Sequence, residues 1–163
     1  PPSTSAVPGR KNRAFPKISF SCTQRNTGYG ICHSILQKSV EANSRYLALT
    51  DLIFSWLERP GSKAVTSTIT MMELLVRPYR ELDESRVDEF YGLLSTYPNL
   101  DWIVPDLEIA DLAARIRVRH RLRFPDDVQA ATAAHAKATG LITNDPVFER
   151  LEAFETLVLD QIL

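Results

Sequence analysis

Long apolar runs and cysteines are both scarce in this 163-residue chain. The longest apolar run is four residues, Tyr46–Leu49, whereas a membrane-spanning helix needs about 18 or more. The basic N-terminal residues are followed by no apolar core of the kind a signal peptide has. The two cysteines, Cys22 and Cys32, are too few for a disulfide scaffold, and their spacing fits no CxxC zinc motif. We therefore expect one globular domain, with no membrane association, in a reducing cytoplasm.

Acidic residues are missing from the first thirty positions. That segment carries five basic residues, whereas the remaining positions hold 14 basic and 20 acidic residues, a net charge of −6. The segment also holds four of the ten prolines and three of the six glycines. Such a composition cannot bury enough apolar surface to offset its ordering entropy. We expect residues 1–30 to be a disordered basic tail, or a mis-translated one, and residues 31–163 to form the domain. Because the body is acidic, any nucleic-acid contact must come from a local patch.

Beyond an ambiguous stretch at 31–40, short strands alternate with amphipathic helices. Helical spacing or capping signals predict helices over 46–58, 67–77, 83–97, 106–121 and 125–139, and a short one after 145. Pro78 should end the second helix, and Gly140 should end the fifth. Strands are expected at 64–66, 101–104, 141–143 and 156–159. This alternation predicts an α/β fold, a three-layer sandwich with a central parallel sheet that places ligands at the carboxyl ends of its strands.

Three acidic residues stand near predicted strand ends. Glu73 lies in the helix after strand 64–66, Asp126 in a helix's first turn, and Asp145 directly after strand 141–143. Each also has a purely structural explanation. Asp126 suits a helix dipole, and Asp145 before a proline suits an N-cap. The residues around Glu73 are so apolar that its helix is predicted to be buried. A buried carboxylate is costly unless it is paired or bound to a metal. Alternatively, Glu73 lies on an exposed face of that helix.

From about Val40 to Leu163 the chain resembles a PIN domain, and more narrowly the small ribonuclease toxins of VapC type. The stretches that carry the resemblance are VEANSRY, AVTSTITMMELLVRP, EIADLAARIRVRHRLRFPDDVQAATA, GLITNDPVFERL and LVLDQIL. The resemblance implies an α/β/α fold and a carboxylate cluster that binds Mg²⁺ or Mn²⁺. It also implies cleavage of single-stranded RNA, an antitoxin partner and a homodimer. By position, the family's second, third and fourth acids fall on Glu73, Asp126 and Asp145. Thr143 matches the hydroxyl residue that accompanies the fourth acid, so it joins the three acids as a predicted catalytic residue.

The family's first acid has no counterpart in this chain. Counting back without gaps places its motif on Cys32, His33 and Ser34, within a segment that contains no Asp or Glu. A frameshift, a misassigned start or gene decay would explain the change. Thiolate and imidazole suit Zn²⁺ rather than Mg²⁺, so we interpret Cys32 as a plain strand residue. Three hypotheses follow: a metal-dependent endoribonuclease, a degenerate PIN domain that only binds antitoxin or RNA, and a fragment whose sheet lacks its first strand.

Five arginines recur at alternate positions near the end of one predicted helix. On a continuous helix, Arg115, Arg119 and Arg123 would form one ridge, with Arg117 and Arg121 on another face. They would either contact phosphates beside the metal site or complement the helix dipole.

We expect His120 to be an exposed helix-end residue, and Trp56 and Trp102 to belong to the core. Asp127 points about 100° away from Asp126 on a helix, and should be solvated or partner a site residue.

Overall fold

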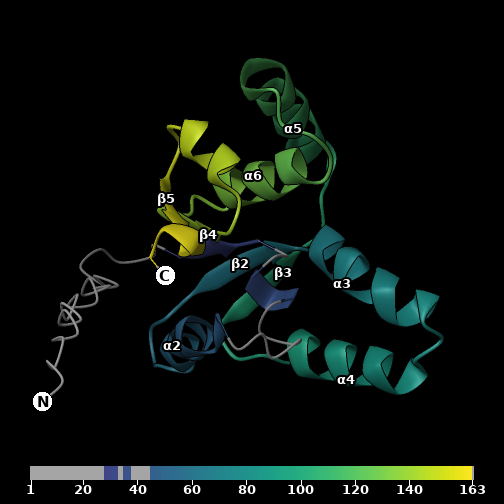
Figure 1. Cartoon of the computed structure of the whole chain (residues 1–163). Helices are drawn as coiled ribbons and strands as arrows, with labels where there is room; N and C mark the ends of the chain where they lie inside the picture. Colours follow the sequence, from purple (N-terminus) through teal and green to yellow (C-terminus); the bar gives the residue numbers. More distant parts are fainter. Residues whose placement is uncertain (1–27, 33–34, 38–44, 163) are drawn as a thin grey trace, which may run out of the picture.

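The computed structural model describes residues 28–32, 35–37 and 45–162. Within them, five strands form one parallel sheet in the order β3-β2-β1-β4-β5 (Figure 1). The strands are β1 (Tyr29–Ile31), β2 (Ala64–Ser67), β3 (Leu100–Ile103), β4 (Gly140–Thr143) and β5 (Glu155–Val158). Most of the predicted tail, together with His33, Ser34 and residues 38–44, lies outside the described residues.

Both faces of the sheet are covered by helices. Neighbouring strand residues belong to different cores: Val65 and Leu141 pack in one, and Ala64 and Ile142 in the other. This is the pattern of a parallel sheet that is buried on both sides. Figure 1 shows α5 (Leu107–His120) and α6 (Asp126–His135) above the sheet, with α2 (Leu47–Leu57) and α4 (Glu84–Ser95) below it. The predicted three-layer α/β/α architecture is therefore confirmed.

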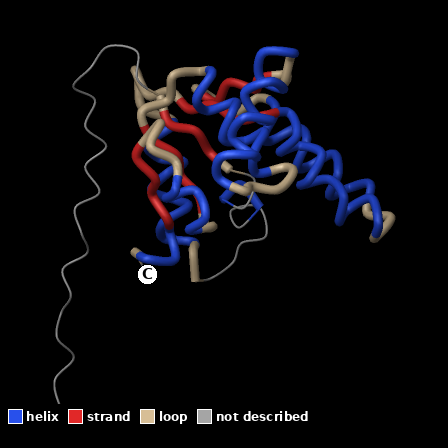
Figure 2. Tube along the Cα trace, turned by 90° about the horizontal axis from the view of Figure 1, so that it is seen from above, coloured by secondary structure: helices blue, strands red, loops and turns tan. Residues whose placement is uncertain are grey.

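Side-chain caps set where several helices begin. Ser67 accepts from the backbone N–H of Ile69 at the start of α3 (Thr68–Arg80). Asp83 and Asp106 cap α4 and α5 in the same way. Helices α3 and α4 lie side by side and extend beyond the sheet, as Figures 1 and 2 show. Among the described residues, no helix is both long and apolar enough to cross a membrane.

The first strand lies at the centre of the sheet, between β2 and β4. It starts at Tyr29, so the predicted end of the tail at residue 30 was placed too late. A Cβ on Gly30 would meet Leu141 Cδ1 at 2.7 Å and Ala133 Cβ at 2.8 Å, because β4 and α6 press closely on this strand. The hypothesis of a fragment without a first strand is therefore wrong.

Two predicted helix ends are also wrong. Pro78 lies inside α3, which continues to Arg80. Proline lacks a backbone N–H and so removes one hydrogen bond of the helix, and the helix tolerates this loss because Pro78 is in its last turn. Helix α6 ends at His135, and Lys137 takes a left-handed conformation with φ 55°. Gly140 is instead the first residue of β4, where a Cβ would meet the Tyr29 ring at 2.5 Å. Packing against β1, rather than a helix stop, requires glycine at this position.

Candidate active site at the carboxyl edge of the sheet

The sheet changes its winding direction at β1. The chain passes from β1 to β2 on one side, while β4 flanks β1 on the other. Ligands of such sheets bind in the crevice outside the carboxyl ends of the strands at this point. Cys32 follows β1, and its N–H donates to the Ile142 carbonyl at 3.1 Å. The Thr143 hydroxyl, at the end of β4, hydrogen-bonds the Cys32 side chain, so the two strand ends meet through these buried side chains.

Asp145 stands next to this junction on an exposed turn. Its backbone N–H donates to Thr143 Oγ1 at 3.1 Å. Its Oδ1 accepts from the Val147 N–H at 2.9 Å and so caps the 3₁₀ helix η1 (Pro146–Arg150). The predicted capping role is confirmed, and because it uses Oδ1 it is compatible with a second role for the carboxylate.

Asp126 begins α6 at the same edge and is half-buried. Burial is the largest cause that raises the pKa of its carboxyl, followed by the negative charges of Asp145 and Asp127. The structure thus brings Asp126 within electrostatic range of Asp145.

Glu73 projects from α3 and is also half-buried. Burial and the charge of Asp126 raise its pKa from 4.5 to about 7, and a hydrogen bond from Gln129 opposes that rise. Of the two explanations for Glu73, a helix buried on every side is wrong and a helix with an exposed face is what is found, because Met72 is 48% and Val76 46% exposed. Glu73 therefore lies between the core side of α3 and its open side.

Cys32 lies where the electrostatic effects of all three acids meet. Burial raises the pKa of its thiol to about 12, the Thr143 hydrogen bond lowers it, and the charges of Asp126, Glu73 and Asp145 raise it further. At neutral pH this position therefore carries a neutral thiol. Among the described residues, no three His, Cys, Asp or Glu side chains form a group that could hold a metal ion as they stand. The three acids lie at one edge of the sheet and interact electrostatically, but in this structure they are not close enough together to coordinate a single ion.

Asp127 takes a different direction from Asp126. It is 1% exposed, and its Oδ2 accepts from Arg117 Nε at 2.5 Å, so the first of the two predicted alternatives, a solvated side chain, is wrong. The ion pair joins the buried Asp127 of α6 to the half-exposed Arg117 of α5, beside the acids.

The arginine ridge is interrupted before Arg123. Helix α5 ends at His120, and Arg121 has a left-handed φ of 57°. Arg115 and Arg117 are engaged on the helix, with Asp111 at 2.8 Å and with Asp127. The predicted ridge that includes Arg123 is therefore wrong, and Arg121 and Arg123 belong to the loop that leads into α6.

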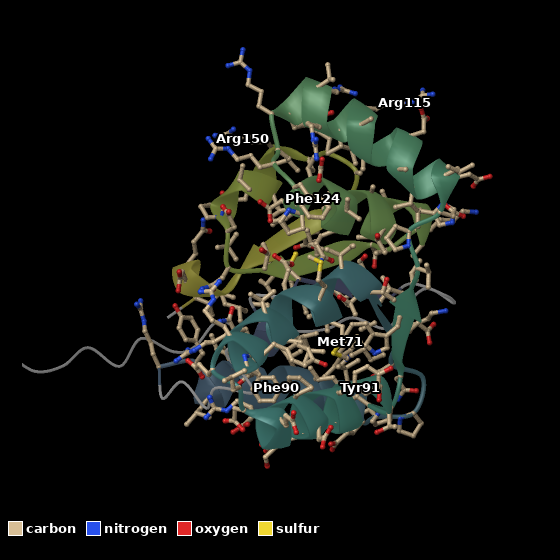
Figure 3. The ribbon with its side chains drawn as sticks, turned by 90° about the vertical axis from the view of Figure 1, so that its right-hand side faces the viewer. Met71, Phe90, Tyr91, Arg115, Phe124 and Arg150 are labelled. Atoms are coloured by element: carbon tan, nitrogen blue, oxygen red, sulfur yellow. The ribbon has the colours of Figure 1, made fainter. Side chains whose placement is uncertain are left out.

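That loop presents an aromatic ring at the acidic edge. Leu122 is 3% exposed and anchors the loop, whereas Phe124 is 55% exposed two residues before Asp126. Figure 3 looks onto the carboxyl edge and shows Phe124 between α5 and the labelled Met71 of α3.

The two tryptophans have structural roles, as predicted. Trp56 is buried in the core, and Trp102 donates from Nε1 to the Leu94 carbonyl at 3.0 Å. His120 is at the predicted helix end but partly buried, against a cavity of about 430 Å³.

Sequence reasoning missed two polar groups at this edge. Gln129, Thr66 and Thr70 form a buried hydrogen-bonded set behind Glu73. Gln129 gave one usable signal: it is a polar residue on the face of α6 that carries Asp126, in an alanine-rich run. The second group joins Asn144 to the Tyr46 hydroxyl at 3.3 Å and to Asp160 at 3.2 Å, and its members are too far apart in sequence to predict.

A family model described as PIN domain matches residues 48–153, more than half of the chain. The chain belongs to the PIN-domain family. PIN domains of the VapC kind are generally nucleases, and PIN nucleases generally use divalent metals. No curated protein matches this PIN domain.

Solved structures share the PIN fold at low sequence identity. VapBC2 from Rickettsia felis, bound to a DNA fragment from its promoter, is 17% identical, with a TM-score of 0.57 over 79% of this chain and 96% of its own. A toxin–antitoxin complex from Klebsiella pneumoniae is 20% identical, with a TM-score of 0.58 over 80% and 96%. DNA-bound VapBC from Salmonella typhimurium is 18% identical, with a TM-score of 0.61 over 80% and 97%. The five-stranded parallel sheet of this chain is thus a VapC-like PIN fold.

Proposed function

We propose that this PIN domain is a metal-dependent endoribonuclease that hydrolyses RNA phosphodiester bonds, and that it is the toxin of a toxin–antitoxin pair. One observation carries the proposal: Glu73, Asp126 and Asp145 converge on the carboxyl edge of a PIN sheet. Burial, and after it the negative charges of neighbouring carboxylates, raise the pKa values of Glu73 and Asp126, and such raised values are common where acidic groups are gathered at a functional site.

The chemistry of the donor set fits a hard divalent cation. All three groups are carboxylates, the ligands that Mg²⁺ and Mn²⁺ prefer, and carboxylates that repel one another are stabilised by a cation between them. Glu73, Asp126 and Asp145 would hold the ion, and Thr143 would fix the backbone of Asp145. A bound ion lowers the pKa of a water and stabilises negative charge on a phosphate. The neutral Cys32 thiol adds neither charge nor a hard donor.

The loop before α6 supports RNA as the substrate. Arg121 and Arg123 are exposed cations within it, suited to phosphate contacts. Phe124 offers an exposed ring on which an unstacked base can lie, as aromatic residues do in proteins that bind single-stranded nucleic acids. Because Phe124 is two residues from Asp126, their Cα atoms lie within about 7 Å. A base on this ring would place its phosphate near the acids.

An exposed stripe on α3 supports a protein partner. Met72, Val76 and Tyr79 are separated by four and three residues on one helix face and are 48%, 46% and 59% exposed. Apolar side chains at this spacing are the usual anchors of helix-in-groove contacts. We assign the partner as an antitoxin, since the similar structures are toxin–antitoxin complexes. We also propose that the protein is a homodimer in the cytoplasm.

A second candidate function is a PIN domain that binds an antitoxin or RNA without cutting. The observation that favours it is the buried, neutral Cys32 at the position of the family's first acid. A site with three carboxylates instead of four holds a divalent cation less tightly, and cleavage needs that cation. Binding of an antitoxin or RNA through other surfaces does not, so it would persist after cleavage is lost.

The deciding experiment is cleavage of a labelled panel of single-stranded RNAs in Mg²⁺ or Mn²⁺. Asp145→Asn keeps a good N-cap for η1 while it removes one charge, and Asp111→Asn, at an exposed ion pair on α5, is the matched control. We expect at least a hundredfold loss of cleavage in Asp145→Asn and in EDTA, and none in Asp111→Asn. Cleavage that survives in Asp145→Asn refutes the proposed site, and a folded wild-type chain without cleavage favours the second candidate.

A further inference from the structure

A buried chain of polar side chains runs from the central strand to Glu73. Thr66 Oγ1 donates to the Ile31 carbonyl at 2.8 Å and lies 2.9 Å from Thr70 Oγ1. Gln129 Nε2 donates to Thr70 Oγ1, and the Gln129 side chain also hydrogen-bonds Glu73. Thr66, Thr70 and Gln129 are at most 3% exposed. The chain therefore links β1, β2, α3 and α6 without access to water.

Counting donors fixes the direction of these hydrogen bonds. The only hydroxyl hydrogen of Thr66 goes to Ile31, so Thr66 must accept from Thr70. The Thr70 hydrogen is then used, and Thr70 can only accept from the Gln129 amide. An amide carries two N–H donors on one nitrogen. With one of them held by Thr70, the other is the donor that the Glu73 carboxylate receives.

We propose that Gln129 is a positioning residue, which holds the Glu73 carboxylate in the orientation that the metal site needs. The inference rests on the proposed metal-dependent function. Gln129 follows Asp126 by three residues on α6, and Thr70 precedes Glu73 by three residues on α3, so each pair shares a helix face. The Gln129 amide, anchored by Thr70, thus fixes the position of the Glu73 carboxylate on α3 relative to Asp126 on α6. Such groups behind metal ligands orient the ligands and strengthen binding.

The test measures Mn²⁺ binding to the metal-free chain by calorimetry, which does not depend on catalysis. Gln129→Met keeps the length of the side chain and removes the amide, and we expect it to weaken Mn²⁺ binding by about 10–100-fold. Thr70→Val should weaken binding by a smaller factor, since the amide loses its anchor but keeps its donor. In cleavage assays at limiting Mn²⁺, kcat should fall while KM for RNA stays unchanged.

The matched control is Thr132→Val, which lies on the same helix. Thr132 is 1% exposed, and its hydroxyl donates to the Val128 carbonyl at 2.8 Å, away from the chain that reaches Glu73. Thermal denaturation of every variant confirms that it is folded. Equal effects of Gln129→Met and Thr132→Val, or unchanged affinity in Gln129→Met, would overturn the inference while wild-type Mn²⁺ binding still stands. A wild-type chain that binds no Mn²⁺ would overturn the proposed function, and this inference with it.

Discussion

Replacing Cys32 by aspartate should strengthen metal binding, because this position faces all three acids. Without metal, the new carboxyl group replaces a 2% exposed thiol among negative charges. Burying a polar group with incomplete partners costs about 1–3 kcal/mol. For a chain of this size, each kcal/mol lowers Tm by about 2–4 °C. The metal-free Cys32→Asp variant should therefore melt roughly 2–12 °C below the wild type.

Added Mn²⁺ should reverse this loss. A ligand at 100 times its Kd stabilises the folded state by about 2.7 kcal/mol, which recovers most of the deficit. Metal affinity should rise at least tenfold over the wild type, about 1.4 kcal/mol, and cleavage at limiting Mn²⁺ should rise with it. Thermal melts over a Mn²⁺ titration, together with RNA cleavage, measure both effects.

Cys32→Asn provides the matched control, because asparagine has the size and polarity of aspartate without its charge. It should lose stability in the metal-free state but gain no additional stabilisation from Mn²⁺. If Cys32→Asp and Cys32→Asn respond alike to Mn²⁺, then position 32 does not face the metal, and the reasoning that places it among the three acids of the metal site is refuted.

Three further predictions concern the neighbouring residues. The pKa of Glu73 is raised from 4.5 to about 7, so the folded metal-free chain binds this proton more tightly than the unfolded chain, and stability falls as pH rises across that window. The slope of Tm between pH 4.5 and 7 should be flatter in Glu73→Gln, and equal slopes would contradict the shift. Phe124→Ala should raise KM for single-stranded RNA about fivefold or more, because stacking on an aromatic side chain contributes roughly 1–3 kcal/mol per base; an unchanged KM would remove Phe124 from the substrate path. Arg117→Met leaves the buried carboxylate of Asp127 without its ion pair and should cost roughly 1–3 kcal/mol in chemical denaturation, whereas Arg115→Met, at an exposed pair, should cost under about 1 kcal/mol.

Local chemistry in the sequence predicted much of the architecture. Alternating strands and helices indicated a parallel sheet, and the caps at Ser67 and Asp145 are found where they were expected. Features set by contacts between distant segments could not be predicted. The sequence pattern predicts Gly140 as a helix stop, whereas glycine is needed there because the Tyr29 ring leaves no room for a Cβ. Tyr29 itself is in a segment whose composition favours disorder.

The candidate site divides in the same way. The positions of Glu73, Asp126 and Asp145 after strands or at a helix start could be predicted, because parallel strands share one carboxyl edge. Their role as metal ligands stays a prediction. The hydrogen bond of the Gln129 amide and the ion pair of the buried Asp127 depend on how α6 packs against α3 and α5, which no local pattern in a single sequence encodes.

The central position of β1 also affects when the acidic edge forms. Tyr29 pairs with Gly140 across more than a hundred residues, and pairing between such distant segments is slow because a long loop must close first. A nascent chain that has not yet reached β4 contains Glu73 and Asp126, but it lacks both Asp145 and the strand that pairs with β1. The proposed nuclease would therefore be inert through most of its own synthesis, and a chain truncated before β4 would be harmless to the RNA around it.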